Sequence, residues 1–253
     1  MQATKSTPSE KLTTQLEPHE LYWLLQTEAD VPTENDWLSA DEAACLNGLR
    51  FAKRRSDWRL GRWTAKLAVS LYLSEPSHTQ ALANIEIRPA PSGAPEVLIA
   101  NQLADVTISL SHSSSVAVCA LVPHRTPLGC DVEAIEPRND SFVADYFTEE
   151  EQEMVARAPV ADRPRLVTLI WSAKESTLKA LQEGLRLDTR TVEVTAAGTA
   201  GRSTKDEDQD WSPLQVRAAT GEDFSGWWRQ TGNLMFTLVA PKPQTRPINL
   251  KKF

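Results

Sequence analysis

The stretch LGCDVE, residues Leu128–Glu133, alternates apolar and polar side chains, as a half-buried strand does. Asp131 and Glu133 are two residues apart, so an extended chain places both carboxylates on one face. A second stretch, WSAKESTLK at Trp171–Lys179, has helical spacing: its first residue, Glu175 and its last residue are four apart and share a face. Together the two stretches predict a strand and a helix that bring three carboxylates to one place.

Two carboxylates from a strand and one from a helix provide the oxygen-only ligands that a hard divalent cation favours. Mg²⁺ in such a site keeps positions for water and for a substrate phosphate, and Lys174 and Lys179 would suit the phosphates. A lone Asp-x-Glu pair is usually a solvated strand face. Here the opposite face is apolar and Glu175 adds a third carboxylate, which favours a metal site.

The composition excludes several classes of protein. A net charge of −7 over 253 residues argues against a general polyanion binder. Three scattered cysteines without a C-x-x-C pair argue against a disulfide framework or a zinc site and suggest a cytoplasmic protein. No apolar run approaches the ~18 residues of a membrane span. Residues 1–18 are polar and lack the apolar core of a secretory signal, so we expect a loose tail.

Strands and helices are expected in both halves of the chain. The sequence predicts strands within 19–31, 85–88, 96–100, 106–112, 115–122, 128–134, 226–229 and 234–239, and helices from Ser39, over about 57–73, after Thr148 and over about 165–182. Residues 199–212 are polar and charged, which favours a mobile loop.

An internal echo indicates duplication. Trp63–Ala68 (WTAKLA) returns 108 residues later as Trp171–Ser176 (WSAKES), and Ala120–Pro123 (ALVP) resembles Leu238–Pro241 (LVAP). The rigid connector PHRTP, Pro123–Pro127, would join the two copies. We therefore expect an N-terminal half at 19–123, a C-terminal half at 128–241, and tails at 1–18 and 242–253.

The pattern Gly-x-Asp-x-Glu followed by Trp-x-x-Lys-Glu-x-x-x-Lys resembles the Sfp-type 4′-phosphopantetheinyl transferases, over roughly residues 20–240. Those enzymes move the phosphopantetheine arm of coenzyme A to a serine of an acyl or peptidyl carrier protein and release adenosine 3′,5′-bisphosphate. The resemblance implies an α+β fold, a pseudo-dimer of two similar α+β halves with the active site in the cleft between them. It also implies that Asp131, Glu133 and Glu175 bind Mg²⁺, or Mn²⁺ in its place.

The resemblance further implies which residues bind coenzyme A. Lys174 and Lys179 match positions that contact its phosphates, and His112 lies in a Ser-His-Ser segment like that of the family. Arg55 and Arg62 belong to an element that holds the 3′-phosphate and adenine. The sequence departs from the family at Ala94, where a lysine is common.

The proton acceptor for the serine is left open between Glu175, Glu151 and a water. General-base catalysis favours a pKa near the working pH, but a bound Mg²⁺ lowers the pKa of a carboxylate that holds it. For this reason Glu151 or a water is as good a candidate for the proton acceptor as Glu175. A helix N-terminus that is rich in acids would by itself explain Glu151 and its two neighbours.

The basic cluster around Arg55 and Arg62 could also receive an acidic carrier protein. Nucleic acid fits less well, because no recognised binding motif accompanies the cluster. We expect a monomer, because a duplicated chain already supplies both halves of the cleft. Two alternatives remain: a catalytically weak homologue that binds coenzyme A or a carrier protein, and an unrelated Mg²⁺-dependent phosphoesterase with water as acceptor. The sequence leaves the carrier protein open.

Overall fold

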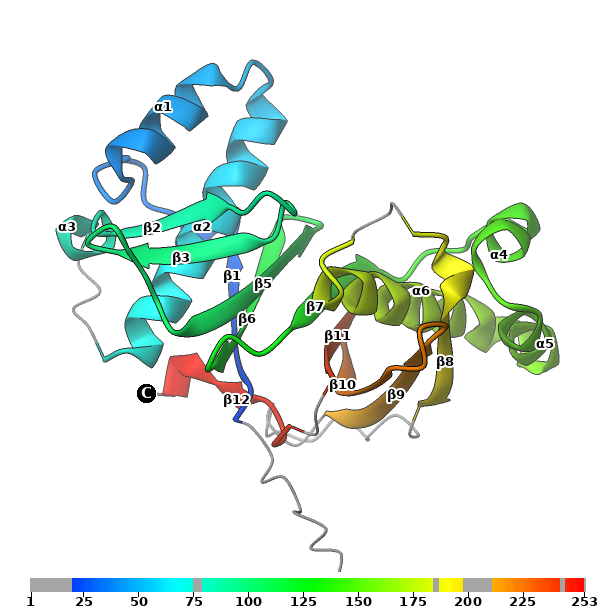
Figure 1. The fold of residues 1–253 in the computed structure, drawn as a ribbon. Coiled ribbons are helices and arrows are strands. Elements are labelled where there is room, and N and C mark those ends of the chain that lie inside the picture. Colours follow the sequence, from blue (N-terminus) through cyan, green and yellow to red (C-terminus); the bar gives the residue numbers. More distant parts are fainter. Residues whose placement is uncertain (1–19, 75–78, 184–186, 198–210, 242–243, 253) are drawn as a thin grey trace, which may run out of the picture.

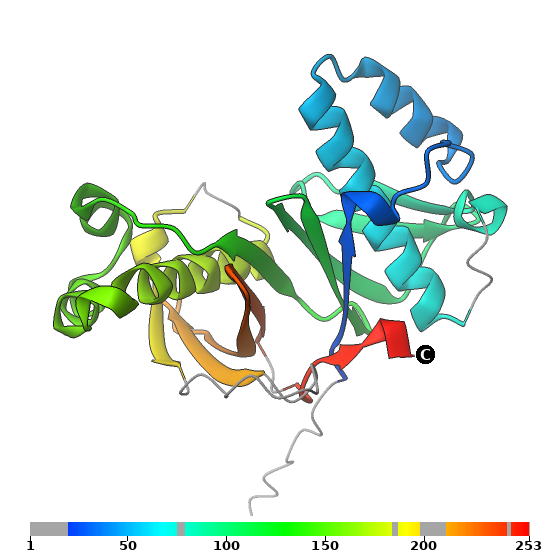
Figure 2. The same cartoon turned by 180° about the vertical axis from the view of Figure 1, so that it is seen from behind.

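Two α+β halves lie side by side, and each consists of a sheet crossed by one long helix (Figure 1). The view from behind shows the same separation (Figure 2). The computed structural model describes residues 20–74, 79–183, 187–197, 211–241 and 244–252. The predicted tail at 1–18 and most of the polar segment 199–212 lie outside these ranges.

In the N-terminal half, helix α2 crosses a four-stranded sheet of order β12-β1-β6-β5. A three-stranded sheet of order β2-β3-β4 adjoins it through β3 and β5. The elements are β1 Tyr22–Thr27, α1 Ala40–Gly48, α2 Ala52–Tyr72, α3 Thr79–Leu82, β2 Ile85–Pro89, β3 Pro95–Ile99, β4 Gln102–Leu103, β5 Val106–Ser113 and β6 Val116–Pro123, with a 3₁₀ helix at Glu28–Asp30. The apolar spacing on α2 explains its position, because Trp63, Ala65 and Val69 are buried against this sheet.

In the C-terminal half, helix α6 lies against a five-stranded sheet of order β7-β11-β10-β9-β8. The elements are β7 Gly129–Ala134, α4 Asp140–Tyr146, α5 Glu149–Arg157, α6 Arg163–Ala180, β8 Val192–Ala197, β9 Ser212–Ala218, β10 Asp223–Thr231 and β11 Leu234–Ala240, with 3₁₀ helices at Val160–Asp162 and Thr189–Thr191. Gly129 allows the close approach of β7 to α6, since a Cβ there would lie 1.7 Å from the carbonyl oxygen of Ser176.

The two halves repeat one order of elements. In each half the first strand pairs antiparallel with the last, β1 with β6 and β7 with β11. A short helix with a capping box then precedes the long helix: Ser39 and Glu42 cap α1, and Thr148 and Glu151 cap α5. The predicted α+β pseudo-dimer is therefore confirmed.

A shared core joins the halves along strand β6. Val118, Ala120 and Val122 face a cluster that includes Trp23 and the C-terminal half's Phe236, whereas the intervening β6 side chains face the N-terminal core. Because both faces of β6 are buried, its sequence is an almost continuous run of apolar residues. The cleft described below opens along this joint.

The expected tail at 242–253 is wrong for its last described residues. Strand β12, Ile248–Asn249, pairs parallel with β1 of the N-terminal half, and a 3₁₀ helix at Leu250–Lys252 follows. Leu250 is buried in the N-terminal core. A two-residue strand carries too little periodicity to be recognised in a sequence, and its partner lies at the opposite end of the chain.

A substitution of Leu250 tests whether the C-terminal segment packs against the N-terminal half. Leu250→Ala should lower the free energy of unfolding by about 2–3 kcal/mol, because the truncation leaves a cavity in the core. Urea unfolding measures the change, with the exposed neighbour Lys251→Ala as the matched control. Equal stability of the two variants would show that the segment does not pack there in solution.

Candidate active site

Asp131 lies at the joint of the two halves and is almost completely buried. It stands on β7, an edge strand of the C-terminal sheet, beside β5 of the N-terminal half. Its Oδ1 accepts hydrogen bonds from Ser111 Oγ and from Lys179 Nζ, each at 2.8 Å. Its Oδ2 is buried and has no hydrogen-bond partner among the residues that the structure describes. Leaving a buried carboxylate oxygen unpaired costs free energy, so this atom is ready for a ligand.

Glu133 and Glu175 are the neighbours predicted for Asp131. Burial, followed by the charge of Asp131, raises the pKa of each. The indole N–H of Trp171 donates to Glu133 Oε1 at 3.2 Å, and Arg138 lies 3.7 Å from the other oxygen. The effect of the Asp131 charge on both pKa values supports, without testing, the expectation that the three carboxylates lie near one another.

The three carboxylates suit a divalent cation in their chemistry, although their side chains are not already in a coordinating arrangement. Across the described ranges, no three or more His, Cys, Asp or Glu side chains are arranged to hold a metal ion. The chemistry of the donors nevertheless fits Mg²⁺: every donor is a carboxylate oxygen, one buried oxygen lacks a partner, and a cation would offset the repulsion among them.

A cleft of about 530 Å³ adjoins the carboxylates. The turn before β3, strands β3 and β5, the segment that leads to β7, and the end of α6 line it. Among the residues that line the cleft are Arg62, Ala94, Glu96, Arg125, Lys179 and Gln182. A hydrogen bond of 3.2 Å from Ser92 Oγ to Gln182 Oε1 links the halves across it. Its volume is that of a small-molecule site.

Arg62 and Lys179 are the predicted coenzyme A contacts that line this cleft. Within the described part of the chain, Arg62 Nε is buried without a hydrogen-bond partner, and burial lowers the pKa of the guanidinium. Its nearest acid is Glu42, at 3.8 Å, and it lies 5.0 Å from the ring centroid of Trp58. Lys179 reaches both the cleft and Asp131, so it connects the anion-binding wall to the carboxylates.

The structure does not bring Arg55 and His112 into the cleft lining. Arg55 Nη1 donates to the carbonyl oxygens of Leu46 and Leu49, at 2.7 and 3.4 Å, and so closes the C-terminal end of α1. His112 is exposed at the end of β5, with Nε2 3.9 Å from a carboxylate oxygen of Asp57 on α2. Arg55 therefore departs from the expected place in the cleft, because Nη1 of its guanidinium is held by backbone carbonyls, and its expected contact with coenzyme A stays a prediction.

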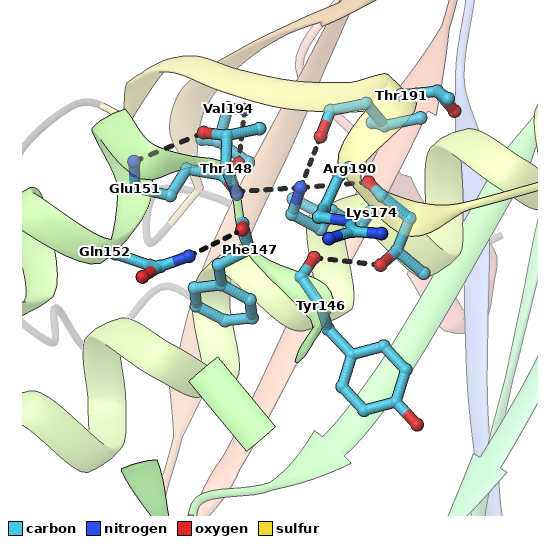
Figure 3. A network of polar contacts seen from close by, with 12 residues as sticks. Tyr146, Phe147, Thr148, Glu151, Gln152, Lys174, Arg190, Thr191 and Val194 are labelled. Atoms are coloured by element: carbon cyan, nitrogen blue, oxygen red, sulfur yellow. Dashed lines mark hydrogen bonds and ion pairs between the residues drawn. The ribbon is translucent and has the colours of Figure 1, made fainter. Parts of the chain in front are cut away.

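Glu151 and Lys174 also need correction, because they form a fully buried ion pair, Nζ to Oε2 2.7 Å (Figure 3). Glu151 accepts from the backbone N–H groups of Thr148 and Val194, at 2.9 Å each. Lys174 donates to the carbonyl oxygen of Thr189 at 3.0 Å. Neither side chain can reach a substrate, so their expected roles as base and as phosphate contact conflict with the structure.

The N-terminal half contains the same pair. Glu42 accepts from the N–H groups of Ser39 and Ile87, at 3.0 Å each, and pairs with buried Lys66. Lys66 donates to the carbonyl oxygen of Trp37 at 2.8 Å. The repeated pair ties the capped helix, the long helix and the following strand together. The sequence held this signal, because Lys66 and Lys174 occupy one position of the WTAK and WSAK echo.

Three residues at the site were not singled out from the sequence: Ser111, Arg125 and Arg138. Ser111 is distant from Asp131 in the chain and meets it only through the joint. Arg125 lies in the connector and has a positive φ of 49°, and Arg138 follows β7 in a loop. None has a periodic pattern that could have indicated its place.

Comparisons with known proteins match this half of the molecule. Residues 127–224 match the model of the 4′-phosphopantetheinyl transferase superfamily. The 4′-phosphopantetheinyl transferase HetI of Nostoc sp. (strain PCC 7120) is 29% identical over 153 residues, which are 58% of this chain and 61% of that protein. The match therefore spans less than two thirds of this relative.

Two solved structures match the chain at low similarity. The holo-(acyl-carrier-protein) synthase of Bacillus anthracis in complex with CoA (3′,5′-ADP) is 22% identical, with a TM-score of 0.35, over 42% of this chain and 96% of that one. The holo-[acyl-carrier-protein] synthase of Thermotoga maritima is 20% identical, with a TM-score of 0.34, over 52% and 76%.

The family match begins just before β7 and continues past α6, so it contains both stretches that supply the carboxylates. No helix within the described ranges has the length and apolarity needed to cross a membrane. Residues 127–224 are thus the part of the chain that is similar to the 4′-phosphopantetheinyl transferase superfamily.

Proposed function

We propose that this protein transfers the 4′-phosphopantetheine arm of coenzyme A to a serine of an acyl or peptidyl carrier protein and releases adenosine 3′,5′-bisphosphate. The observation that carries the proposal is the position of Lys179. Its ammonium group bonds Asp131 and also lines the cleft with Arg62. An anionic ligand in the cleft would therefore have its phosphates beside the three carboxylates.

The reaction requires Mg²⁺, or Mn²⁺ in its place, and Asp131, Glu133 and Glu175 are the residues that would hold it. The cation supplies charge that offsets the negative charge developing on the leaving phosphate. Lys179 and Arg62 bind phosphate oxygens of coenzyme A, with Lys179 on the side of the carboxylates and Arg62 further along the cleft.

The proton of the carrier serine passes to Glu175, directly or through a water. Burial and the charge of Asp131 raise the pKa of Glu175 in the absence of a cation, whereas a bound cation would lower it, which favours a water between Glu175 and the serine as the proton carrier. The serine oxygen then bonds the phosphorus of the arm, while the bond from that phosphorus to the bridging oxygen of the pyrophosphate breaks. Glu151 takes no part, because it is buried against Lys174.

The partners follow from this chemistry. The protein partner is a carrier protein with an accessible serine, and one chain suffices for the cleft because its two halves supply both walls. We also propose that the protein works as a monomer in the cytoplasm.

Intact-mass analysis of an apo carrier protein tests the function. The carrier incubated with this protein, coenzyme A and Mg²⁺ should gain one phosphopantetheine, and EDTA should abolish the gain. A carrier with alanine in place of its serine is the acceptor control. Release of nucleotide without any carrier would instead indicate a phosphoesterase.

Ala94 favours one alternative, a binding module, because it lines the cleft where a lysine is common in the family. Coenzyme A that stays bound during purification, with no transfer to several carriers, would establish that alternative and refute the transferase.

Arg62 provides a test of the cleft. Arg62→Ala should weaken coenzyme A binding about 10-fold or more in isothermal titration, because a half-buried guanidinium that can pair with a phosphate is lost from the anion-binding wall. Arg54→Ala, at an exposed position of the same helix, is the matched control. Equal affinities in the two variants would exclude the cleft as the coenzyme A site.

A further inference from the structure

Strands β5 and β7 meet at the joint of the two halves, although they belong to different sheets. Side chains of β5 make the connection. Ser109 and Ser111 are two residues apart and therefore project from one face of the strand. Ser109 Oγ accepts from the backbone N–H of Cys130 at 2.9 Å, and Ser111 Oγ donates to Asp131 Oδ1 at 2.8 Å.

The second of these bonds orients a carboxylate. Ser111 and Lys179 both donate to Oδ1 of Asp131, which fixes the rotation of the group about its own bond. Oδ2 is left buried, and no group in the described ranges bonds it. A hydroxyl donor on one oxygen and an unpaired second oxygen are the arrangement expected of a carboxylate that binds a cation through the second oxygen.

We propose that Ser111 is a positioning residue for the cation site: it holds Asp131 across the joint so that Oδ2 is presented to a divalent cation. The inference rests on the proposed function, because it assumes that Asp131 is a cation ligand. It adds that the N-terminal half, which supplies none of the three carboxylates, controls the orientation of the most buried of them.

Lys179 cannot replace Ser111 in this task. Its ammonium group lies on the cleft side and also donates to the carbonyl oxygen of Cys130 at 3.0 Å. A ligand phosphate in the cleft would compete with Asp131 for this flexible cation. The hydroxyl of Ser111 is short and stands on a strand, so it keeps Asp131 in place when Lys179 turns to a phosphate.

Binding of Mn²⁺ to the protein without coenzyme A, followed by electron paramagnetic resonance at pH 8, tests the proposal. Ser111→Ala should weaken Mn²⁺ binding about 10- to 100-fold, the usual cost of losing a hydrogen bond to a metal ligand. Ser111→Thr keeps the hydroxyl and should bind Mn²⁺ like the parent. Ser109→Ala removes the neighbouring bond to the β7 backbone but none to Asp131, so its affinity should stay within about threefold of the parent.

Several outcomes would overturn the proposal. Equal Mn²⁺ affinities of Ser111→Ala and Ser109→Ala would show that the serines only align the strands. A Ser111→Thr variant as weak as Ser111→Ala would exclude the hydroxyl as the cause, and a parent protein that binds no Mn²⁺ would exclude the site. The carrier assay separates the two proposals: a parent that binds Mn²⁺ but transfers nothing refutes the transferase, while the serine variants still report on Asp131.

Discussion

Replacing Asp131 by asparagine should reduce transfer to the carrier protein by about 100- to 1000-fold at saturating coenzyme A and Mg²⁺. The loss of a group that stabilises developing charge has a cost of this size. Asp131 is the most buried of the three carboxylates, and its Oδ2 has no partner among the described protein groups. An amide in its place keeps the shape of the side chain but loses the charge that attracts a cation.

The measurement is the initial rate of carrier modification by mass, together with a thermal melt. The matched control is Glu136→Ala, an exposed acid that follows the same strand. The control should keep nearly the parent rate. An Asp131→Asn variant that retains more than about a tenth of the parent rate with Mg²⁺ would contradict the metal-site assignment.

Replacing Lys174 by methionine should lower the free energy of unfolding by about 3–5 kcal/mol. Removing one partner of a buried ion pair leaves an uncompensated charge, here the carboxylate of Glu151. That carboxylate also accepts the N–H groups of Thr148 and Val194, so the cap of α5 and the start of β8 lose support together (Figure 3). Lys174→Met protein that is folded should bind coenzyme A as the parent does.

Urea unfolding measures the first effect and isothermal titration the second. Lys53→Met, at an exposed lysine paired with Asp57, should change stability by less than about 1 kcal/mol. The double variant Lys174→Met, Glu151→Gln should regain part of the lost stability, because both charges are removed together. A Lys174→Met protein with parent stability but weak coenzyme A binding would restore the phosphate-contact role expected from the sequence.

The two buried Glu–Lys pairs show why a family motif alone can assign a wrong role to a residue. Motif matching treats Glu151 and Lys174 as candidates because acids and lysines are the residue types that catalysis and phosphate binding use. The same types also close buried networks, and burial cannot be seen in a linear motif. The echo of Lys66 was the available signal, because a lysine that is repeated in the half without Asp131, Glu133 and Glu175 is more simply explained by the fold.

The sequence by itself determined the two α+β halves and the strand and helix that carry Asp131, Glu133 and Glu175. These follow from local spacing, since a period of two residues or of four places side chains on a common face whatever the rest of the chain does. Only the tertiary structure decided that Arg62 and Lys179 line one cleft, that Arg55, Glu151 and Lys174 serve the scaffold, and that β12 returns to the N-terminal sheet. The physical reason is that burial and hydrogen-bond partners depend on contacts between residues far apart in the chain, such as Ser111 with Asp131, and no local pattern encodes them.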